Sequence, residues 1–285
     1  MSAATSFPPL SPPIDPRVAS RRWLIAITAA LAALLEIVDT SIVNVALTDM
    51  QSSLGATLSE VGWVITSYAI ANVIVLPLAA WLGDTFGKKR YFIFSLIGFT
   101  LSSIMCGLST SLTMLVLARV LQGLTGGGLL AKAQSILFET FPKSEQGKAQ
   151  ALFGVVAIAG PAIGPVLGGY IVTNLDWRWI FFINLPIGIV AVFMAVTFLP
   201  VDEPKKVVER KVDWLGLALL IVGLGSLQTL LEEGQSHDWF DSPEMVALGI
   251  LGVGGVVAFV FRQLRVDYPV VDLSLIHISE PTRPY

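Results

Sequence analysis

Charged side chains lie inside two long segments that are predominantly apolar. Glu36 and Asp39 fall within residues 23–47, and Arg119 falls within residues 112–138. Burying one charge at the centre of a bilayer costs roughly 2.5–3.5 kcal/mol even on the mildest insertion scale. A segment that only had to cross a membrane would not carry such residues. They are therefore candidates for exchanging protons with solvent or for binding a charged solute.

The two carboxylates belong to one polar stripe of a helix. Glu36 and Asp39 are three residues apart, and Thr40 and Asn44 follow four and eight residues after Glu36, so all four share a face. Counting 1.5 Å per residue, Asp39 and Arg119 lie about 10–12 Å from the same end of their segments. Asp39 and Arg119 therefore lie at matched depth in their two segments.

The composition places the whole chain in a membrane. Of its 285 residues, 54% are hydrophobic and only 14% are charged, and the mean hydropathy is +0.74. A soluble domain of this size needs more polar surface. The single cysteine, Cys106, excludes an intrachain disulfide and a cysteine metal cluster. With two histidines and neither a G-x-x-x-x-G-K-[ST] loop nor an H-E-x-x-H motif, we predict no catalytic residue, metal, cofactor or nucleic-acid partner.

Apolar runs long enough to cross about 30 Å of hydrocarbon occur eight times. We therefore predict an all-α polytopic membrane protein, with a six-helix bundle followed by two further helices. The predicted spans are residues 23–47, 61–82, 91–109, 112–138, 149–173, 179–199, 214–232 and 244–264.

Lysine and arginine predict the orientation of these spans. With a cytoplasmic N-terminus, fourteen of them fall in cytoplasmic segments and only Arg178 falls in an outer loop. Because positive residues are enriched on the cytoplasmic side, we expect a multi-pass protein of the inner (plasma) membrane with its N-terminus inside. The fourteen are Arg17, Arg21, Arg22, Lys88, Lys89, Arg90, Lys143, Lys148, Lys205, Lys206, Arg210, Lys211, Arg262 and Arg265.

Polar ends and linkers divide the chain into five segments. We predict a disordered Pro-rich cytoplasmic tail over residues 1–22, the six-helix bundle over 23–199, a cytoplasmic linker over 200–212 and the additional helix pair over 213–272. Residues 273–285 begin LSLIHISEPTR, which matches the translation of a transposase-type sequencing adapter in one frame. We interpret them as an artefact, and on that interpretation the chain is the front part of a longer protein.

The segment AWLGDTFGKKR, between the second and third spans, predicts a tight turn with positive charge beside it. Asp84, Gly87, Lys88 and Lys89 match the spacing G-x-L-x-D-R-x-G-R-K, and the segment resembles this cytoplasmic signature of the major facilitator superfamily. An alanine replaces the first glycine of the signature, and a threonine replaces its arginine. These departures affect any charge relay that needs the arginine, but not the turn.

Arg119, Gln122 and Gly123 form R-x-x-Q-G, which resembles the fourth-helix motif of the same superfamily. In that family the arginine is linked to proton transfer. The alternative is an arginine that snorkels to the outer surface. Lys132 lies on the inner half of the same segment, where the resemblance implies a neutral residue. It either snorkels inward or faces a cavity.

Small residues recur every four positions in the fifth span. The glycines of GPAIGPVLGG would form a smooth face that lets two membrane helices approach closely, and its prolines favour a bend. Close packing alone would explain these residues. The stretch also matches G-x-x-x-G-P-x-x-G-G at every fixed position, and so resembles the motif associated with antiporters in this superfamily. Its residues are Gly160, Pro161, Gly164, Pro165, Gly168 and Gly169.

Further stretches resemble the EmrB/QacA family of fourteen-span drug:proton antiporters, and are most similar to its EmrB-type exporters. They are residues 35–47, 63–82, 177–188, 215–244 and 268–275. The resemblance implies the major facilitator fold, with a second bundle that this chain does not include. In that fold three-plus-three inverted repeats build the six-helix bundle, and they make its first and fourth helices equivalent, with both bordering a central cavity. Because Asp39 and Arg119 also lie at matched depth, we expect them to approach each other, directly or through water. A pair that only holds two helices together is the alternative to a pair that exchanges protons.

The same resemblance implies proton-driven export of varied amphiphilic molecules by alternating access. In a Gram-negative cell it implies a periplasmic adaptor protein and an outer-membrane channel as partners. An exporter of a single metabolite is an alternative with the same fold, and a membrane enzyme or ATP-driven pump is a distant one. The implied proton-coupling residues are Asp39, Arg119 and Glu36, and the candidates for lining the substrate cavity are Asn44, Tyr68 and Gln122.

Overall fold

The computed structural model describes residues 16–201 and 213–266, which are helical apart from short connections and contain no strand. Eight spans in this part of the chain are long and apolar enough to cross a membrane, as predicted, and α4 with α5 and α7 with α8 each make one of them. The elements are α1 (Pro16–Leu54), α2 (Leu58–Phe86), α3 (Lys88–Gly107), α4 (Leu112–Gly126), α5 (Leu129–Thr140), α6 (Gln146–Asn174), α7 (Trp179–Phe182), α8 (Asn184–Phe198), α9 (Trp214–Glu233), the 3-10 turns η1 (Gly234–His237) and η2 (Trp239–Asp241), and α10 (Pro243–Gln263).

Parts of four predicted segments lie outside the described residues. They are residues 1–15 of the predicted tail, 202–212 of the linker, 267–272 of the helix pair and the whole of 273–285.

The first helix begins earlier than predicted. α1 starts at Pro16, so residues 16–22, which were predicted to be disordered, are helical. Proline suits the first turn of a helix, because its missing N–H would have no intrahelical acceptor there. Arg22 forms a 2.8 Å ion pair with Glu145, next to the start of α6. This contact ties the early part of α1 to the bundle.

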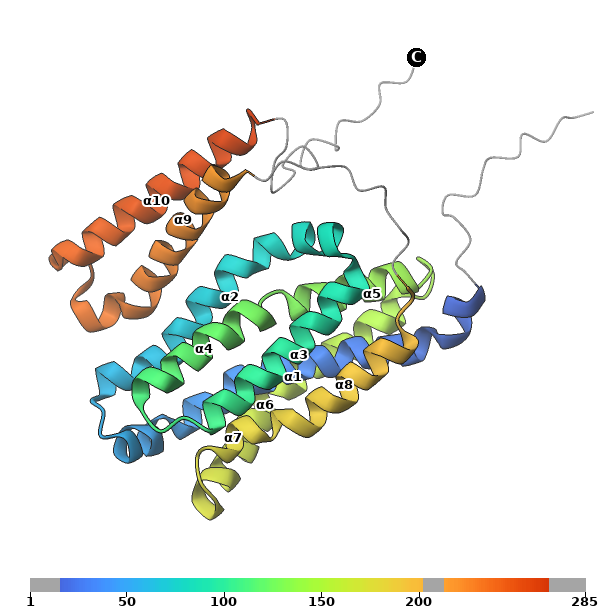
Figure 1. Cartoon of the computed structure of the whole chain (residues 1–285), viewed down its shortest axis with the longest axis horizontal. Helices are drawn as coiled ribbons and strands as arrows, with labels where there is room; N and C mark the ends of the chain where they lie inside the picture. The colour runs from blue at the N-terminus through green and yellow to red at the C-terminus, as the bar shows by residue number, and fades with distance from the viewer. Residues whose placement is uncertain (1–15, 202–212, 267–285) are drawn as a thin grey trace, which may run out of the picture.

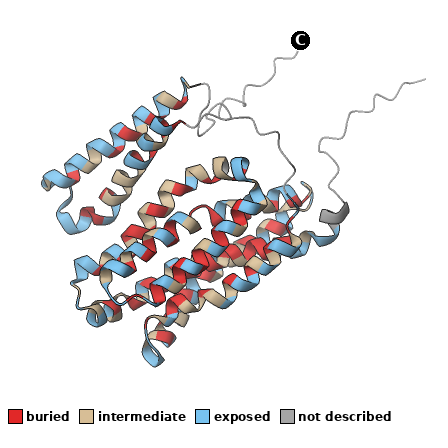
Figure 2. Ribbon diagram, in the orientation of Figure 1, coloured by how far each residue is buried: buried red, intermediate tan, exposed pale blue. Residues whose placement is uncertain are grey.

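The helices from α1 to α8 pack side by side around α1 (Figure 1). α1 packs against α6, α5 and α8, while α4 packs against α2 and α3. Buried residues lie mainly on the faces that these helices turn toward one another (Figure 2, red). They form two apolar clusters, one around Leu35 and Phe99 and the other around Ile42 and Phe181. The charged site described below lies on the same buried faces.

The predicted glycine face of α6 packs directly on α1. A Cβ at Gly164 would overlap Ser41 Oγ and lie 2.8 Å from Ser41 Cβ. A Cβ at Gly160 would overlap Ile37 Cγ2, and one at Gly168 would lie 2.9 Å from Ile42 Cγ1. α6 continues as one helix through both prolines of the motif, whose side chains are exposed. The close-packing role of these glycines is therefore confirmed, and α1 is the helix that packs against them.

The predicted tight turn between α2 and α3 is confirmed and consists of one residue. Gly87 has φ +93°, which side chains larger than hydrogen rarely tolerate. Directly after it, Lys88 Nζ lies 2.5 Å from Glu139 Oε1 of α5. Lys89 Nζ donates to two carbonyl oxygens at the end of α8, each 2.8 Å away, where the helix dipole favours a cation. The two lysines thus connect α3 to α5 and α8, at the end of the bundle where α2 meets α3.

α9 and α10 form a hairpin that packs against α2 (Figure 1). The two backbones meet at Gly223 and Gly255, where a Cβ on Gly255 would lie 2.8 Å from Gly223 Cα. At one end of the hairpin, Asp213 caps α9 and accepts hydrogen bonds from Arg262 (2.7 Å) and Gln263 (3.1 Å). Glycine contact and an ion pair therefore hold the two helices together.

Asp213→Asn is expected to lower the unfolding temperature of the purified protein at pH 7. Hydrogen bonds from Arg262 hold the pKa of Asp213 below its ordinary value of 3.8, so the stabilisation is present above that value and is lost as the pH falls through the folded-state pKa. The deficit of the variant should therefore shrink below about pH 4. Thermal unfolding in detergent measures it, with Asp176→Asn as the control. An equal pH profile in both variants would contradict the assignment.

Candidate functional site

The predicted approach of Asp39 and Arg119 is confirmed as a buried ion pair between α1 and α4. Arg119 Nη1 lies 2.6 Å from Asp39 Oδ2, and the exposed fractions of the two side chains are 1% and 0%. A buried pair of this kind repays its desolvation only when further hydrogen bonds satisfy both charged groups. The surroundings of each partner therefore decide what the pair can do.

Asp39 is surrounded by side-chain donors. Its Oδ1 accepts hydrogen bonds from Gln122 Nε2 (2.9 Å) and from Asn184 Nδ2 (2.7 Å). Asn184, in the first turn of α8, also donates to Ser103 Oγ of α3 (3.0 Å). With Arg119 on Oδ2, three side chains donate to this carboxylate, and hydrogen bonds of this kind to a charged acceptor are stronger than neutral ones.

Arg119 has several partners besides Asp39. Its Nε donates to the carbonyl oxygen of Val64 on α2 (3.0 Å), and its Nη1 donates to Gln122 Oε1 (2.7 Å). The guanidinium carbon lies 4.1 Å from the ring centre of Tyr68, a distance typical of a cation–π contact. Arg119 therefore keeps partners in a state in which Asp39 is neutral.

Glu36 forms a separate site on the same helix. Its Oε1 accepts a hydrogen bond from Asn72 Nδ2 (2.8 Å), and its Oε2 accepts one from the backbone N–H of Leu130 (2.9 Å). Asn72 Nδ2 also lies 3.3 Å from Tyr68 Oη. Through Asn72 and Tyr68, the two acidic sites are neighbours in one polar network.

The three predicted cavity residues fall in different places. Tyr68 and Gln122 are 4% and 0% exposed and contact Arg119, so they belong to the buried network. Asn44 is exposed and donates to the carbonyl oxygen of Thr40, which is also exposed. Of the three predicted cavity residues, only Asn44 is therefore exposed in this conformation.

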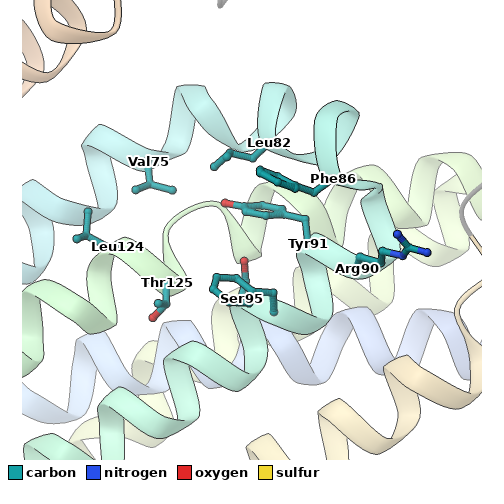
Figure 3. A pocket seen from close by; sticks show the side chains of 9 residues that line it. Val75, Leu82, Phe86, Arg90, Tyr91, Ser95, Leu124 and Thr125 are labelled. Carbon is teal, nitrogen blue, oxygen red and sulfur yellow. The ribbon is translucent and has the colours of Figure 1, made fainter. Parts of the chain in front are cut away.

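An apolar cavity of about 590 Å³ lies between α2, α3 and α4 (Figure 3). Tyr91 lies between the α2 side chains Leu82 and Phe86 and the α3 side chain Ser95, while Arg90 points away from the middle of the cavity. Neither Asp39 nor Arg119 lines it, so this apolar space is separate from the ion pair. Its lining is Val75, Leu82, Phe86, Arg90, Tyr91, Phe94, Ser95, Leu124 and Thr125.

Lys132 faces a second, smaller cavity. Its Nζ lies 3.8 Å from the ring centre of Tyr91, and it lines a space of about 290 Å³ together with Asp84 and Lys88. This space adjoins the turn between α2 and α3, so Lys132 points toward that end of the bundle.

Sequence reasoning missed Asn72 and Asn184. Both are amides within predicted spans, and a polar side chain in a span usually faces the bundle interior. That signal could have identified them, although not their partners. Asn184 is completely buried, and it connects Asp39 to α3 and α8.

Comparison with known proteins identifies a family and several relatives of this chain. The family model of the Major Facilitator Superfamily matches residues 29–266. The chain is 41% identical over 252 residues to the multidrug export protein EmrB of Escherichia coli K12, covering 88% of this chain and 49% of the relative. It is 37% identical over 269 residues to the fatty acid resistance protein FarB of Neisseria gonorrhoeae, covering 94% and 52%. The chain thus spans about half the length of these curated relatives.

Solved transporter structures share the fold. The D-xylose-proton symporter superposes with a TM-score of 0.57 at 16% identity, covering 85% of this chain and 68% of that one. The POT family transporter PepTSo superposes with a TM-score of 0.58 at 19% identity, covering 94% and 56%. The eight membrane-length helices, the matching family model and this shared fold agree: the chain is a multi-pass membrane protein that belongs to the Major Facilitator Superfamily.

Proposed function

We propose that the protein carrying this sequence is a proton-coupled secondary transporter, and not an enzyme, and that it exports varied amphiphilic drugs by alternating access. The observation that carries the proposal is the buried Asp39–Arg119 pair, whose charge one proton can change. The relatives add the direction of transport, because the E. coli protein is named for multidrug export and the N. gonorrhoeae protein for fatty acid resistance.

Asp39 is the proposed proton carrier. A proton on Asp39 cancels its charge and removes the ion pair, while Arg119 keeps its bonds to Val64 and Gln122 and its contact with Tyr68. Loss of the proton restores the pair and pulls α1 and α4 together again. Because Asp39 is fully buried here, proton exchange requires another conformation. That requirement is what couples the proton to alternating access.

Amphiphilic substrates are proposed to bind along the exposed part of α1. Thr40, which directly follows Asp39, and Asn44, about one turn further along, present polar groups there. The glycine contact of α6 with α1 is the proposed antiporter element, because it supports the helix that carries Asp39. The motif that contains Asp84, Lys88 and Lys89 is proposed to close the cytoplasmic end.

The proposed setting is the inner (plasma) membrane, with the N-terminus in the cytoplasm. The excess of lysine and arginine in alternate connections supports this orientation. A periplasmic adaptor and an outer-membrane channel are the proposed partners in a Gram-negative cell. We further propose that residues 23–199 form the transport bundle and that residues 213–272 form an additional helix pair joined to it by a cytoplasmic linker.

Cells that lack their own multidrug exporters are expected to become resistant to several unrelated amphiphilic drugs when they express the protein. Inverted membrane vesicles should accumulate a fluorescent amphiphile when respiration acidifies their lumen, and should lose it when an uncoupler collapses the gradient. Asp39→Asn is expected to abolish this accumulation, because that side chain cannot take up and release a proton.

Three results would count against this function. Resistance to a single compound favours the exporter of one metabolite. Accumulation that needs ATP without a proton gradient favours an ATP-driven pump. Transport by Asp39→Asn with unchanged pH dependence removes Asp39 from proton coupling. Glu232→Gln, which changes an exposed carboxylate on α9, is the matched control and should transport normally.

A further inference from the structure

The fourth span is broken where α4 ends and α5 begins. α4 ends at Gly126 and α5 starts at Leu129, and between them Gly128 has φ +86°, which glycine adopts at little cost. A new helix start leaves its first N–H groups without intrahelical acceptors. The N–H of Leu130 is one of these, and it donates to Glu36 Oε2 at 2.9 Å.

Glu36 connects this new helix start to two other helices. Its side chain comes from α1, its Oε1 accepts from Asn72 of α2 at 2.8 Å, and its Oε2 accepts from α5. The carboxylate is only 8% exposed. A negative charge is favoured at a helix N-terminus, and hydrogen bonds to a charged acceptor are stronger than neutral ones. The strength of this three-helix contact therefore depends on the charge of Glu36.

The surroundings of Glu36 supply no countercharge in direct contact. Asp39 lies one turn along α1, and the hydroxyl of Tyr68 of α2 lies 3.3 Å from Asn72 Nδ2, which donates to Glu36. Arg119 of α4 is already paired with Asp39, and the Nζ of Lys132 of α5 lies over the ring of Tyr91. Within the described part of the chain, no cation forms an ion pair with Glu36. Two uncharged donors bind the Glu36 carboxylate. A proton that binds this carboxylate therefore competes with hydrogen bonds and not with an ion pair.

We propose that Glu36 is a latch on the break in the fourth span: ionised, it holds the start of α5 against α1 and α2, and a proton on it releases α5. The two halves of this span are then anchored separately. α4 is held by the Asp39–Arg119 pair, and α5 by Glu36. Glu36 is thus a positioning residue that acts on the α2–α3 end of the bundle through α5, whereas the ion pair acts on α4. Its use in transport rests on the function proposed above.

Hydrogen exchange of the purified full-length protein tests the latch. Glu36→Gln replaces one acceptor oxygen by an N–H₂ group, so either Asn72 or the Leu130 N–H loses its acceptor. Loss of one hydrogen bond to a charged group predicts exchange about tenfold faster over residues 129–140. Glu232→Gln is the matched control, because it makes the same chemical change on the exposed face of α9, and it should leave this exchange unchanged.

The pH response separates a latch from a merely structural contact. In the wild type, exchange over residues 129–140, corrected for its intrinsic chemical rate, should rise on acidification, whereas Glu36→Gln should show no such rise. Asn72→Ala leaves Glu36 in place and provides a second test, with faster exchange expected. Wild-type exchange in both variants, or an equal pH response in Glu36→Gln, overturns the latch. A wild type that transports no drug overturns the proposed function but leaves the exchange results standing.

Discussion

Arg119→Met is expected to lower the free energy of unfolding by roughly 3–5 kcal/mol, the usual cost of leaving a buried charge without its partner. Asp39 is fully buried, and Arg119 is the one cation that lies within 4 Å of it among the described residues. Methionine fills much of the space of the arginine side chain. The loss of stability therefore reflects the removed charge more than a newly formed cavity. Unfolding in mixed micelles of detergent and sodium dodecyl sulfate measures it.

A second substitution separates the charge from the packing. Asp39→Asn combined with Arg119→Met removes both charges, so the double variant should regain most of the lost stability but should not transport. Arg178→Met is the control, because Arg178 pairs with Asp176 on the surface, where the side chains are 30% and 51% exposed; a change below about 1 kcal/mol is expected there. A double variant as unstable as Arg119→Met would show that the pair does not set the stability of the bundle.

The sequence was sufficient for features that follow from helix geometry alone. The eight spans depend on length and hydropathy, and both are local properties of the sequence. The approach of Asp39 and Arg119 needed two arguments, namely matched depth in two helices and a family resemblance that implies that both helices border the central cavity. The glycine face around Gly164 followed from a four-residue spacing, although the spacing did not say which helix would pack on it.

The features that sequence reasoning missed depend on tertiary contacts. The break at Gly128 interrupts a segment whose hydropathy is continuous. Three consecutive glycines, Gly126 to Gly128, are a local signal for this break, but hydropathy alone predicts one unbroken span. The partners of Glu36 include the backbone N–H of Leu130, which exists as a free donor only because the helix breaks there. Asn184 reaches Asp39 across 145 positions of sequence. Its role follows from how α8 packs, and hydropathy alone does not encode that.

Gly164→Val is expected to destabilise the bundle by at least about 1–3 kcal/mol, the usual cost of overpacking, and to abolish transport. A Cβ at this position overlaps Ser41 Oγ and lies 3.2 Å from the backbone nitrogen of Ile42, so a rotamer change of Ser41 alone cannot accommodate valine. α1 must move away from α6. Because α1 also carries Asp39, the same displacement disturbs the 2.6 Å contact with Arg119.

Gly169→Val is the matched control in the same motif. A Cβ at Gly169 meets no atom within 4 Å among the described residues, so the same substitution there should change stability by less than about 0.5 kcal/mol. The comparison tests how the antiporter motif acts. If Gly164→Val kept full stability and transport, the α1–α6 contact would not position Asp39. If both variants lost transport but kept stability, the motif would act through something other than this contact. Loss at Gly164 alone is the result expected if the glycines serve to hold the helix that carries the proton.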